Sequence, residues 1–227
     1  VFYAVGKAIT VPLAKGLWRP TITGRDNIPR SGGVILASNH LSFIDSFAIP
    51  IASPRPVSFL AKSDYFTGTG VSGAIRRGFF VGSQAIPVDR HSSRAAQESL
   101  ELALEVLREG RAFGIYPEGT RSRDGRIYRG RTGVAWLALT AGVPVVPVGL
   151  VGTDKVQPVG AKLPSLAKVR VAFGTPISPQ RYAAMPAGRA RRELTDEIML
   201  AIATLSGQER VDAYNELPPG SDPAIGG

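Results

Sequence analysis

Residues 92–116 of the 227-residue chain read SSRAAQESLELALEVLREGRAFGIY. Within 92–109, apolar side chains recur at helical spacing and gather on one side, at Ala96, Leu100, Ala103, Leu104 and Leu107. This spacing predicts an amphipathic helix, and Gly110 is the residue type that commonly ends one. The apolar run from Ala112 to Tyr116 is too short for a helix and predicts a buried strand. A helix leading into a buried strand is the repeating unit of an α/β sheet.

Short apolar runs elsewhere in the chain repeat the pattern of that strand. They are rich in β-branched residues and lie at Val34 to Ala37, Val57 to Ala61, Ala85 to Val88, Val143 to Val151 and Val169 to Phe173. Continuous apolar runs are typical of strands that are buried on both faces. A second helix is predicted from Arg189 to Leu205, where apolar residues again recur at helical spacing. We therefore expect an α/β fold with a central, mostly parallel sheet flanked by helices.

The composition favours one globular domain with terminal extensions. Hydrophobic residues make up 44% of the chain and charged residues 20%, which supports a core that forms without a partner. We expect this domain to cover residues 21–206. The tail, residues 207–227, shows no periodicity and contains several prolines and glycines, so it is predicted to be loose.

Residues 1–20 mix cations with large apolar side chains, which predicts an N-terminal amphipathic helix interrupted by Pro12. Two interpretations are equally supported: a helix that lies on a membrane surface, and a terminal helix packed on its own domain. No run of roughly 18 consecutive apolar residues occurs, so we expect no segment of this sequence to cross a bilayer. The chain begins with Val1 rather than methionine, which is compatible with removal of a targeting sequence.

The balance of charges favours anionic partners. Lysine and arginine number 27 against 18 acidic residues, a net charge of +9, which suits lipid headgroups, phosphorylated metabolites or nucleic acid. Cysteine is absent, which excludes disulfides, thiolate metal sites and a cysteine nucleophile. The chain has two histidines, so we do not expect a metal site.

The run Asn39-His40-Leu41-Ser42-Phe43-Ile44-Asp45 comes directly after a predicted buried strand, where open α/β sheets tend to bind ligands. If the whole run were helical, His40 and Asp45 would lie on different faces. If Ser42 instead caps a helix that begins at Phe43, Asp45 lies in the first turn and can point back to the imidazole, as a catalytic pair requires. The alternative is that Asp45 only accepts hydrogen bonds from backbone N–H groups.

A second polar run, Pro117-Glu118-Gly119-Thr120-Arg121-Ser122, follows the predicted strand that ends at Tyr116. Four more arginines come soon after it, at Arg123, Arg126, Arg129 and Arg131. In a parallel sheet the two polar runs would share one edge, which would place His40 near a group of guanidinium groups. Arginine binds phosphate with a planar pair of donors. Taken alone, this loop would more often be a solvated basic loop.

Together and in this order, the two runs resemble those of the glycerolipid acyltransferases, in particular the enzymes that acylate 1-acylglycerol-3-phosphate. The histidine motif of that family corresponds to Asn39, His40 and Asp45, and its Pro-Glu-Gly-Thr-Arg motif to residues 117–121. A weaker middle motif corresponds to residues 82–90, and a proline-punctuated strand to residues 143–148. The resemblance covers residues 22–173.

This resemblance implies transfer of a fatty acyl group from acyl-CoA or acyl carrier protein to the sn-2 hydroxyl of 1-acylglycerol-3-phosphate, giving phosphatidate without a metal or cofactor. His40 would act as the general base and Asp45 would orient it. Substrate would be bound by Lys62, Arg90, Glu118, Gly119, Thr120 and Arg121. The protein would act peripherally on the cytoplasmic face of the cell membrane, on a lysophospholipid acceptor, and would not bind nucleic acid.

Three departures from the pattern of the family leave its acyl-chain and headgroup preference open. Tyr116 stands where phenylalanine is usual, Ile86-Pro87 replaces a more aromatic middle motif, and Arg131 stands where lysine is common. None of these departures removes a charged residue of the two main motifs.

Several alternative functions remain. Within the family, the acceptor could be glycerol-3-phosphate, another lysophospholipid or a glycolipid. A non-catalytic protein that binds anionic membranes or nucleic acid would explain the charge but not the His–Asp pair, and Tyr128 is the one aromatic residue among the arginines. The glycine pattern at residues 68–73 lacks the preceding strand of a dinucleotide site. No Gly-x-Ser-x-Gly sequence of a serine hydrolase occurs.

Overall fold

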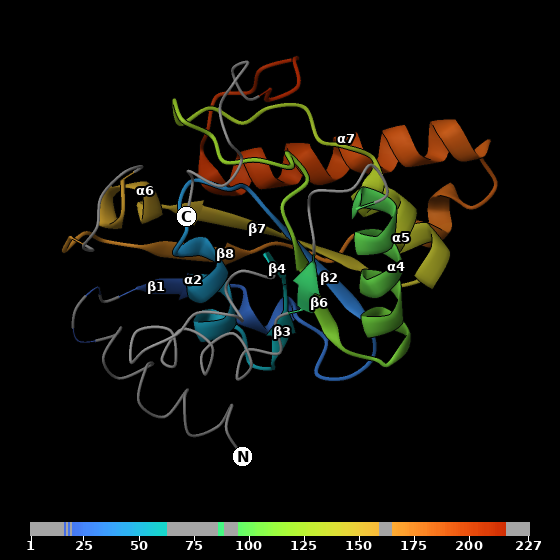
Figure 1. Ribbon diagram of the computed structural model, residues 1–227, viewed down its shortest axis with the longest axis horizontal. Helices are drawn as coiled ribbons and strands as arrows, with labels where there is room; N and C mark the ends of the chain where they lie inside the picture. The colour runs from blue at the N-terminus through green and yellow to red at the C-terminus, as the bar shows by residue number, and fades with distance from the viewer. Residues whose placement is uncertain are drawn as a thin grey trace.

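The structure, a computed structural model, describes Gly16, Trp18 and residues 20–62, 86–88, 95–158 and 165–216, with the backbone alone at 61–62, 86–88 and 95–96. Figure 1 shows a sheet with helices on both sides. In chain order the elements are β1 (Thr21–Thr23), η1 (Arg25–Asn27), β2 (Val34–Ser38), α2 (Asp45–Ala52), β3 (Val57–Ser58), β4 (Leu60–Lys62), β5 (Ile86–Val88), α4 (Ala95–Arg108), β6 (Ala112–Ile115), α5 (Gly133–Ala141), β7 (Val145–Val151), α6 (Thr153–Val156), β8 (Arg170–Phe173), η3 (Pro179–Tyr182) and α7 (Ala187–Ser206).

The main sheet has six strands in the order β1-β8-β7-β2-β6-β3. Four of its pairings are parallel, β1 with β8, β7 with β2, β2 with β6, and β6 with β3. One pairing, between β7 and β8, is antiparallel. The expected mostly parallel α/β sheet is therefore confirmed.

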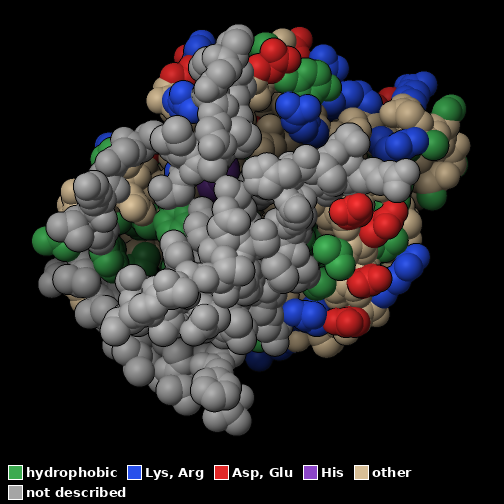
Figure 2. Space-filling view, in the orientation of Figure 1, with side chains coloured by type: hydrophobic (Ala, Val, Ile, Leu, Met, Phe, Trp, Pro, Cys, Tyr) green, Lys and Arg blue, Asp and Glu red, His purple; other side chains and the backbone are tan. Residues whose placement is uncertain are grey.

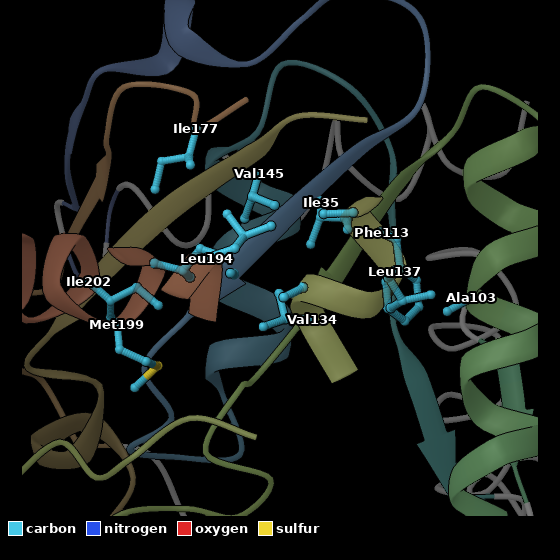
Figure 3. Close-up of a cluster of buried hydrophobic side chains, with 14 of the residues drawn as sticks. Ile35, Ala103, Phe113, Val134, Leu137, Val145, Ile177, Leu194, Met199 and Ile202 are labelled. Atoms are coloured by element: carbon cyan, nitrogen blue, oxygen red, sulfur yellow. The ribbon is translucent and has the colours of Figure 1, made fainter. Parts of the chain in front are cut away.

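Helices cover both faces of the sheet, which explains why its central strands are apolar without a break. On β2, Ile35 and Ala37 face a core formed with α4, α5 and α7, while Val34 and Leu36 face a second core that includes Ile49 of α2. All four β2 side chains are fully buried. The first of these cores is drawn in Figure 3. Each large aliphatic side chain buried in this way contributes roughly 1.5–3 kcal/mol to folding.

The two long helices follow the spacing of their apolar residues. Along α7, Leu194, Ile198 and Ile202 are completely buried against the sheet. Gly207 ends this helix with a φ of 75°, and Gly110 follows α4 with a φ of 74°. Both glycines adopt the left-handed conformation that ends a helix, so the predicted stop at Gly110 is confirmed.

The run from Val57 to Ala61 was predicted as one strand but forms two. β3 is an edge strand of the main sheet, whereas β4 pairs with β5 in a separate two-stranded sheet. Phe59, which separates them, is buried in the second core. Because its side chain packs into the main domain, the backbone changes partner on either side of it. The short strand β1, with its partly polar sequence Thr-Ile-Thr, was not predicted.

The two chain ends were predicted to be an amphipathic helix and a loose tail. The predicted helix over residues 1–20 lies outside the described residues except at Gly16, Trp18 and Pro20, and the Trp18 indole donates a hydrogen bond to the carbonyl of Ser165 at 2.9 Å. No helix in the described part of the chain is long and apolar enough to cross a membrane.

In the tail, residues 208–216, which we call the C-terminal strap, lie along the loop of residues 121–131, which we call the arginine loop. Ile127 and Arg210 form a parallel β-bridge. In Figure 1 both segments lie above α7, the arginine loop in yellow-green and the strap in red. This part of the tail is therefore packed on the domain, whereas residues 217–227 lie outside the described residues.

Candidate active site

The two polar runs lie at the same edge of the sheet, as expected. β2 and β6 are parallel neighbours, with Ala37 opposite Ile115, so the residues that follow the two strands emerge together. The loops are also joined directly, because the N–H of Ser122 donates to the carbonyl of His40 at 2.8 Å. The sheet register therefore places the histidine motif beside the arginine loop.

His40 and Asp45 form a hydrogen-bonded pair. Nδ1 of His40 lies 2.8 Å from Oδ2 of Asp45; the Asp45 side chain is fully buried and the His40 side chain is 17% exposed. The same carboxylate oxygen accepts the N–H groups of Leu41 at 2.7 Å and Ser42 at 2.8 Å. Both contacts that the sequence allowed are therefore present: Asp45 hydrogen-bonds with the imidazole and also accepts backbone N–H groups.

Asp45 reaches the imidazole from the first turn of α2, but the predicted cap is wrong. The helix begins at Asp45 rather than Phe43, and Ile44 occupies the N-cap position. The Ser42 hydroxyl donates instead to the carbonyl of Gln157 at 2.9 Å. Because the Asp45 carboxylate already accepts the N–H groups of the preceding loop, the Ser42 hydroxyl is available to hydrogen-bond with the segment that follows α6.

An aromatic column supports the imidazole. The rings of His40 and Tyr116 stack with centroids 3.8 Å apart and planes 8° apart, and Phe59 lies beneath Tyr116 at 5.6 Å. The Tyr116 hydroxyl hydrogen-bonds with that of Ser46 at 2.9 Å. Desolvation, and then the charge of Asp45, raise the pKa of Tyr116 well above its usual range. The ring therefore stays neutral and fixes the plane of the imidazole.

Glu118 is a buried carboxyl group that holds the arginine loop. Its side chain is 1% exposed, and Oε2 accepts the N–H of Tyr128 at 2.9 Å. Burial raises the pKa of Glu118 from its ordinary 4.5 to about 7, although the backbone N–H groups of Tyr128 and His40 lower it. Glu118 thus contacts the protein's own backbone at this site.

Gly119 allows the sharp turn that precedes the arginine loop. Its N–H donates to the carbonyl of Tyr116 at 3.0 Å, and its φ is 79°, a conformation that side-chain-bearing residues rarely adopt. A Cβ at this position would also lie 3.0 Å from Nε of Arg131. Arg131 is fixed in turn by its N–H, which donates to the carbonyl of Pro117 at 2.8 Å.

Three other arginines of the loop, Arg126, Arg129 and Arg131, have local partners. Arg126 pairs with Asp124 at 2.6 Å, and the guanidinium groups of Arg129 and Arg131 lie 5.5 and 5.6 Å from the ring centre of Tyr214 in the strap. Arg121 is partly exposed, and its carbonyl accepts a hydrogen bond from Asn215 at 3.1 Å. Figure 2 shows Lys and Arg side chains, interspersed with acidic ones, over this upper region of the molecule.

Asn39 connects three parts of the site and was quoted only as a motif residue in the sequence. Its side chain accepts the N–H of Leu150 at 2.8 Å and donates to the carbonyl of Leu150 at 2.9 Å, which extends the β2–β7 pairing beyond the end of β2. It also donates to the Gln208 side chain at 2.7 Å. Gln208 lies in a region without periodicity, so no sequence signal pointed to it.

The remaining candidates are only partly placed. The backbone of Lys62 pairs with Val88 at the end of the small sheet, but its side chain is not described. Arg90 lies outside the described residues, and Thr120 is a partly exposed residue of the turn. Among the described residues, no group of three or more acidic or histidine side chains is arranged to hold a metal ion.

Comparison with known proteins agrees with the position of these motifs. The sequence profile of the family described as Acyltransferase matches residues 19–151, more than half of the chain. The chain belongs to the acyltransferase family. The match includes β2, the His–Asp pair, β6 and the arginine loop.

Relatives of this acyltransferase domain include enzymes from plants and bacteria. The chain is 30% identical over 162 residues to 1-acyl-sn-glycerol-3-phosphate acyltransferase BAT2, chloroplastic, of Brassica napus, a match that covers 70% of this chain and 45% of that protein. It is 33% identical over 133 residues to the 1-acyl-sn-glycerol-3-phosphate acyltransferase of Borreliella burgdorferi, covering 59% and 51%. The chain thus spans about half the length of these relatives.

The fold is shared with a solved acyltransferase structure. The crystal structure of the 1-acyl-sn-glycerophosphate (LPA) acyltransferase PlsC from Thermotoga maritima matches with a TM-score of 0.64 and 23% identity, covering 88% of this chain and 79% of that one. At this identity the likeness supports the fold of the domain.

Proposed function

We propose that this chain transfers a fatty acyl group from a thioester to the sn-2 hydroxyl of 1-acylglycerol-3-phosphate, giving phosphatidate. The observation that carries the proposal is the His40–Asp45 hydrogen bond of 2.8 Å, at the sheet edge from which the arginine loop also emerges. The printed activities of the relatives from Brassica napus and Borreliella burgdorferi agree with it.

His40 is the general base in this proposal. An alkyl hydroxyl hardly ionises near neutrality, so its proton must be removed as it attacks the thioester carbon. Nδ1 of His40 is engaged by Asp45, which leaves Nε2 to take the proton. Asp45 fixes the tautomer and stabilises the positive charge that the ring gains, and such base catalysis contributes ~10²–10⁴-fold to rate.

Arg121 binds the acceptor phosphate in the proposed site. It follows the Gly119 turn, whose backbone is anchored to Tyr116. A guanidinium group offers two parallel donors to a phosphate, which positions the lipid as well as attracting it. Lys62 and Arg90 are proposed as further phosphate contacts. Glu118 acts by holding the loop through Tyr128.

The donor is proposed to be acyl-CoA or an acyl carrier protein, and the site of action the cytoplasmic face of the cell membrane. A net charge of +9 favours association with anionic lipid headgroups. Both the acceptor and the acyl chain are lipids, so a protein that binds the membrane peripherally would meet them at the surface.

The test is acyl transfer by the purified protein, with labelled acyl-CoA and acyl carrier protein as donors in separate arms. Acceptors are 1-acylglycerol-3-phosphate, glycerol-3-phosphate and a neutral lysophospholipid. We expect the first acceptor to be used with the highest kcat/KM. Transfer to one of the other acceptors alone would assign the protein a different acyltransferase activity. Transfer to none of them would favour the alternative of a non-catalytic protein that binds anionic membranes.

The variant His40→Ala is expected to lose transfer by ~10²–10⁴-fold, because the base is removed. Its melting temperature and circular dichroism spectrum should stay close to those of the wild type, since the Asp45 carboxylate keeps its hydrogen bonds from the N–H groups of Leu41 and Ser42. Full activity of a folded His40→Ala protein would rule out the mechanism.

The variant Arg121→Lys is expected to raise the acceptor KM by about 10- to 100-fold, because the paired contact with phosphate is lost. The donor KM should not change. An exposed arginine elsewhere provides a matched control, Arg189→Lys, which alters a surface pair with Glu193 on α7. An unchanged acceptor KM in Arg121→Lys would assign this arginine to structure.

A further inference from the structure

The arginine loop contains no helix or strand along residues 121–131, and Ile127 forms its one β-bridge. The proposed contact of Arg121 with phosphate nevertheless depends on the position of this loop. Three main-chain hydrogen bonds join it to the C-terminal strap: Ile127 N–H to Glu209 at 2.9 Å, Val211 N–H to Ile127 at 2.9 Å, and Arg129 N–H to Ala213 at 2.8 Å. The main chain of the strap therefore pairs with the main chain of the loop.

Two side-chain amides fix the ends of this arrangement. Gln208 donates through Nε2 to the carbonyl of Gly125 at 2.7 Å, and Asn215 donates through Nδ2 to the carbonyl of Arg121 at 3.1 Å. Neither residue lies within the stretch that matches the family profile, which ends at residue 151.

Gln208 also reaches the other half of the site. Its Oε1 accepts a hydrogen bond from Asn39 at 2.7 Å, and Asn39 is the residue directly before His40. One side chain thus spans from the end of β2 to the arginine loop. Asn39 is itself fixed on both sides by the backbone of Leu150, so this contact has a rigid base.

We propose that Gln208 and Asn215 are positioning residues for acyl transfer, which hold the arginine loop at a fixed place relative to His40. The inference rests on the function proposed above. A reacting hydroxyl must lie within about 3–3.5 Å of its target, and a misplacement of about 1 Å can lower the rate by ~10²-fold. Neither residue touches substrate in this proposal; both act through the loop and through Asn39.

The experiment compares Gln208→Ala, Asn215→Ala and the double variant with Gln180→Ala. Gln180 is a matched control, because its exposed side chain also donates to a backbone carbonyl, that of Gly142 at 3.1 Å, at the far end of α5. Gln208→Glu adds a test of the individual bonds: it keeps the acceptor for Asn39 but replaces the donor to Gly125 with a carboxylate oxygen.

The double variant is expected to lower kcat/KM for the acceptor by about 10- to 100-fold, through a higher acceptor KM at unchanged donor KM. Gln208→Glu should resemble Gln208→Ala, and melting temperatures should match that of Gln180→Ala. A double variant within twofold of Gln180→Ala would overturn the proposal. The proposal would also be overturned if the KM values for acceptor and donor both rose and the melting temperature fell, because such a result would show a general loss of structure.

Amide hydrogen exchange separates this inference from the proposed function. In the double variant, peptides from residues 121–131 should exchange faster, while those from α4 and α7 are unchanged. This readout stands even if the wild type transfers no acyl group, a result that would remove the proposed function. Unaltered exchange in the loop would show that the two amides do not hold it.

Discussion

At the scale of single residues, the imidazole of His40 is constrained in two independent ways. Asp45 holds Nδ1 in the ring plane, and Tyr116 covers one ring face at 3.8 Å. The first contact sets the tautomer, and the second sets the tilt of the ring. Because the Tyr116 hydroxyl is tied to Ser46, the departure from phenylalanine adds an anchor to the supporting ring.

Substitution at Tyr116 separates these effects. Tyr116→Phe keeps the stacked ring and should lower kcat by less than about tenfold, since one net hydrogen bond contributes about 0.5–1.5 kcal/mol. Tyr116→Leu removes the stack and should lower kcat further, because the imidazole can tilt. The measurement is kcat for both variants at saturating substrates. Equal values for the two variants would show that the aromatic stack does not matter.

At the scale of secondary structure, the aromatic column depends on a glycine in β6. A Cβ on Gly114 would lie 2.1 Å from Cζ of Phe59, so the bare backbone makes room for the Phe59 ring. That ring lies under Tyr116 and marks the point where β3 gives way to β4. A side chain added to β6 at Gly114 would therefore displace the Phe59 ring, then the Tyr116 ring, and through them the imidazole of His40.

Gly114→Ala is expected to displace Phe59 and to destabilise the fold by about 1–3 kcal/mol through overpacking. It should also lower kcat. Gly188→Ala in α7 is the control, because a Cβ there meets nothing within 4 Å and alanine is the better helix former. Urea unfolding and kcat are measured on both. Wild-type stability in Gly114→Ala would mean that Phe59 moves aside at no cost.

The elements that were predicted well are those with a clear period and a stop signal. α4 and α7 were predicted from the helical spacing of their apolar residues, and the end of α4 was predicted from the glycine at position 110. β1 was missed because Thr-Ile-Thr is too short and polar to stand out. The division between β3 and β4 was missed because it is set by the contact between Phe59 and Gly114, residues far apart in the sequence.

For the whole molecule, the buried Glu118 makes stability depend on pH. Its pKa is about 7 in the folded protein against an ordinary 4.5, so between these values the folded state holds a proton that the unfolded state has lost. Stability conferred by this group is therefore largest below pH 4.5 and falls by about 3 kcal/mol as the pH rises to 7 and above.

Glu118→Gln should remove this dependence. We expect the wild type to lose more unfolding free energy than Glu118→Gln between pH 5 and pH 8, measured by urea unfolding. Glu105→Gln, an exposed site on α4, should keep the wild-type slope. Parallel pH profiles for wild type and Glu118→Gln would contradict a proton on the buried carboxyl group.

The candidate site was predictable to the extent that it follows from the sheet. Parallel strands bring their ends to one edge, so His40, Asp45 and the turn before Arg121 could be brought together from the order of motifs alone. Gln208 and Asn215 could not, because they act from an aperiodic segment whose contacts with the loop are set by the completed fold. The predicted N-cap at Ser42 is wrong because the Asp45 carboxylate, rather than the Ser42 hydroxyl, accepts the backbone N–H groups before the helix.

The fixed imidazole has a consequence for the order of events in turnover. With Nδ1 committed to Asp45 and one ring face covered by Tyr116, a single nitrogen would receive the proton from the alcohol and stand next to the departing sulfur. Because this one nitrogen cannot carry the acyl group and accept the proton of the alcohol at the same time, both substrates would have to occupy the protein at once, with no acylated histidine between them. Initial-rate plots against the two substrates would be intersecting lines, the signature of a ternary complex, rather than the parallel lines of a ping-pong cycle.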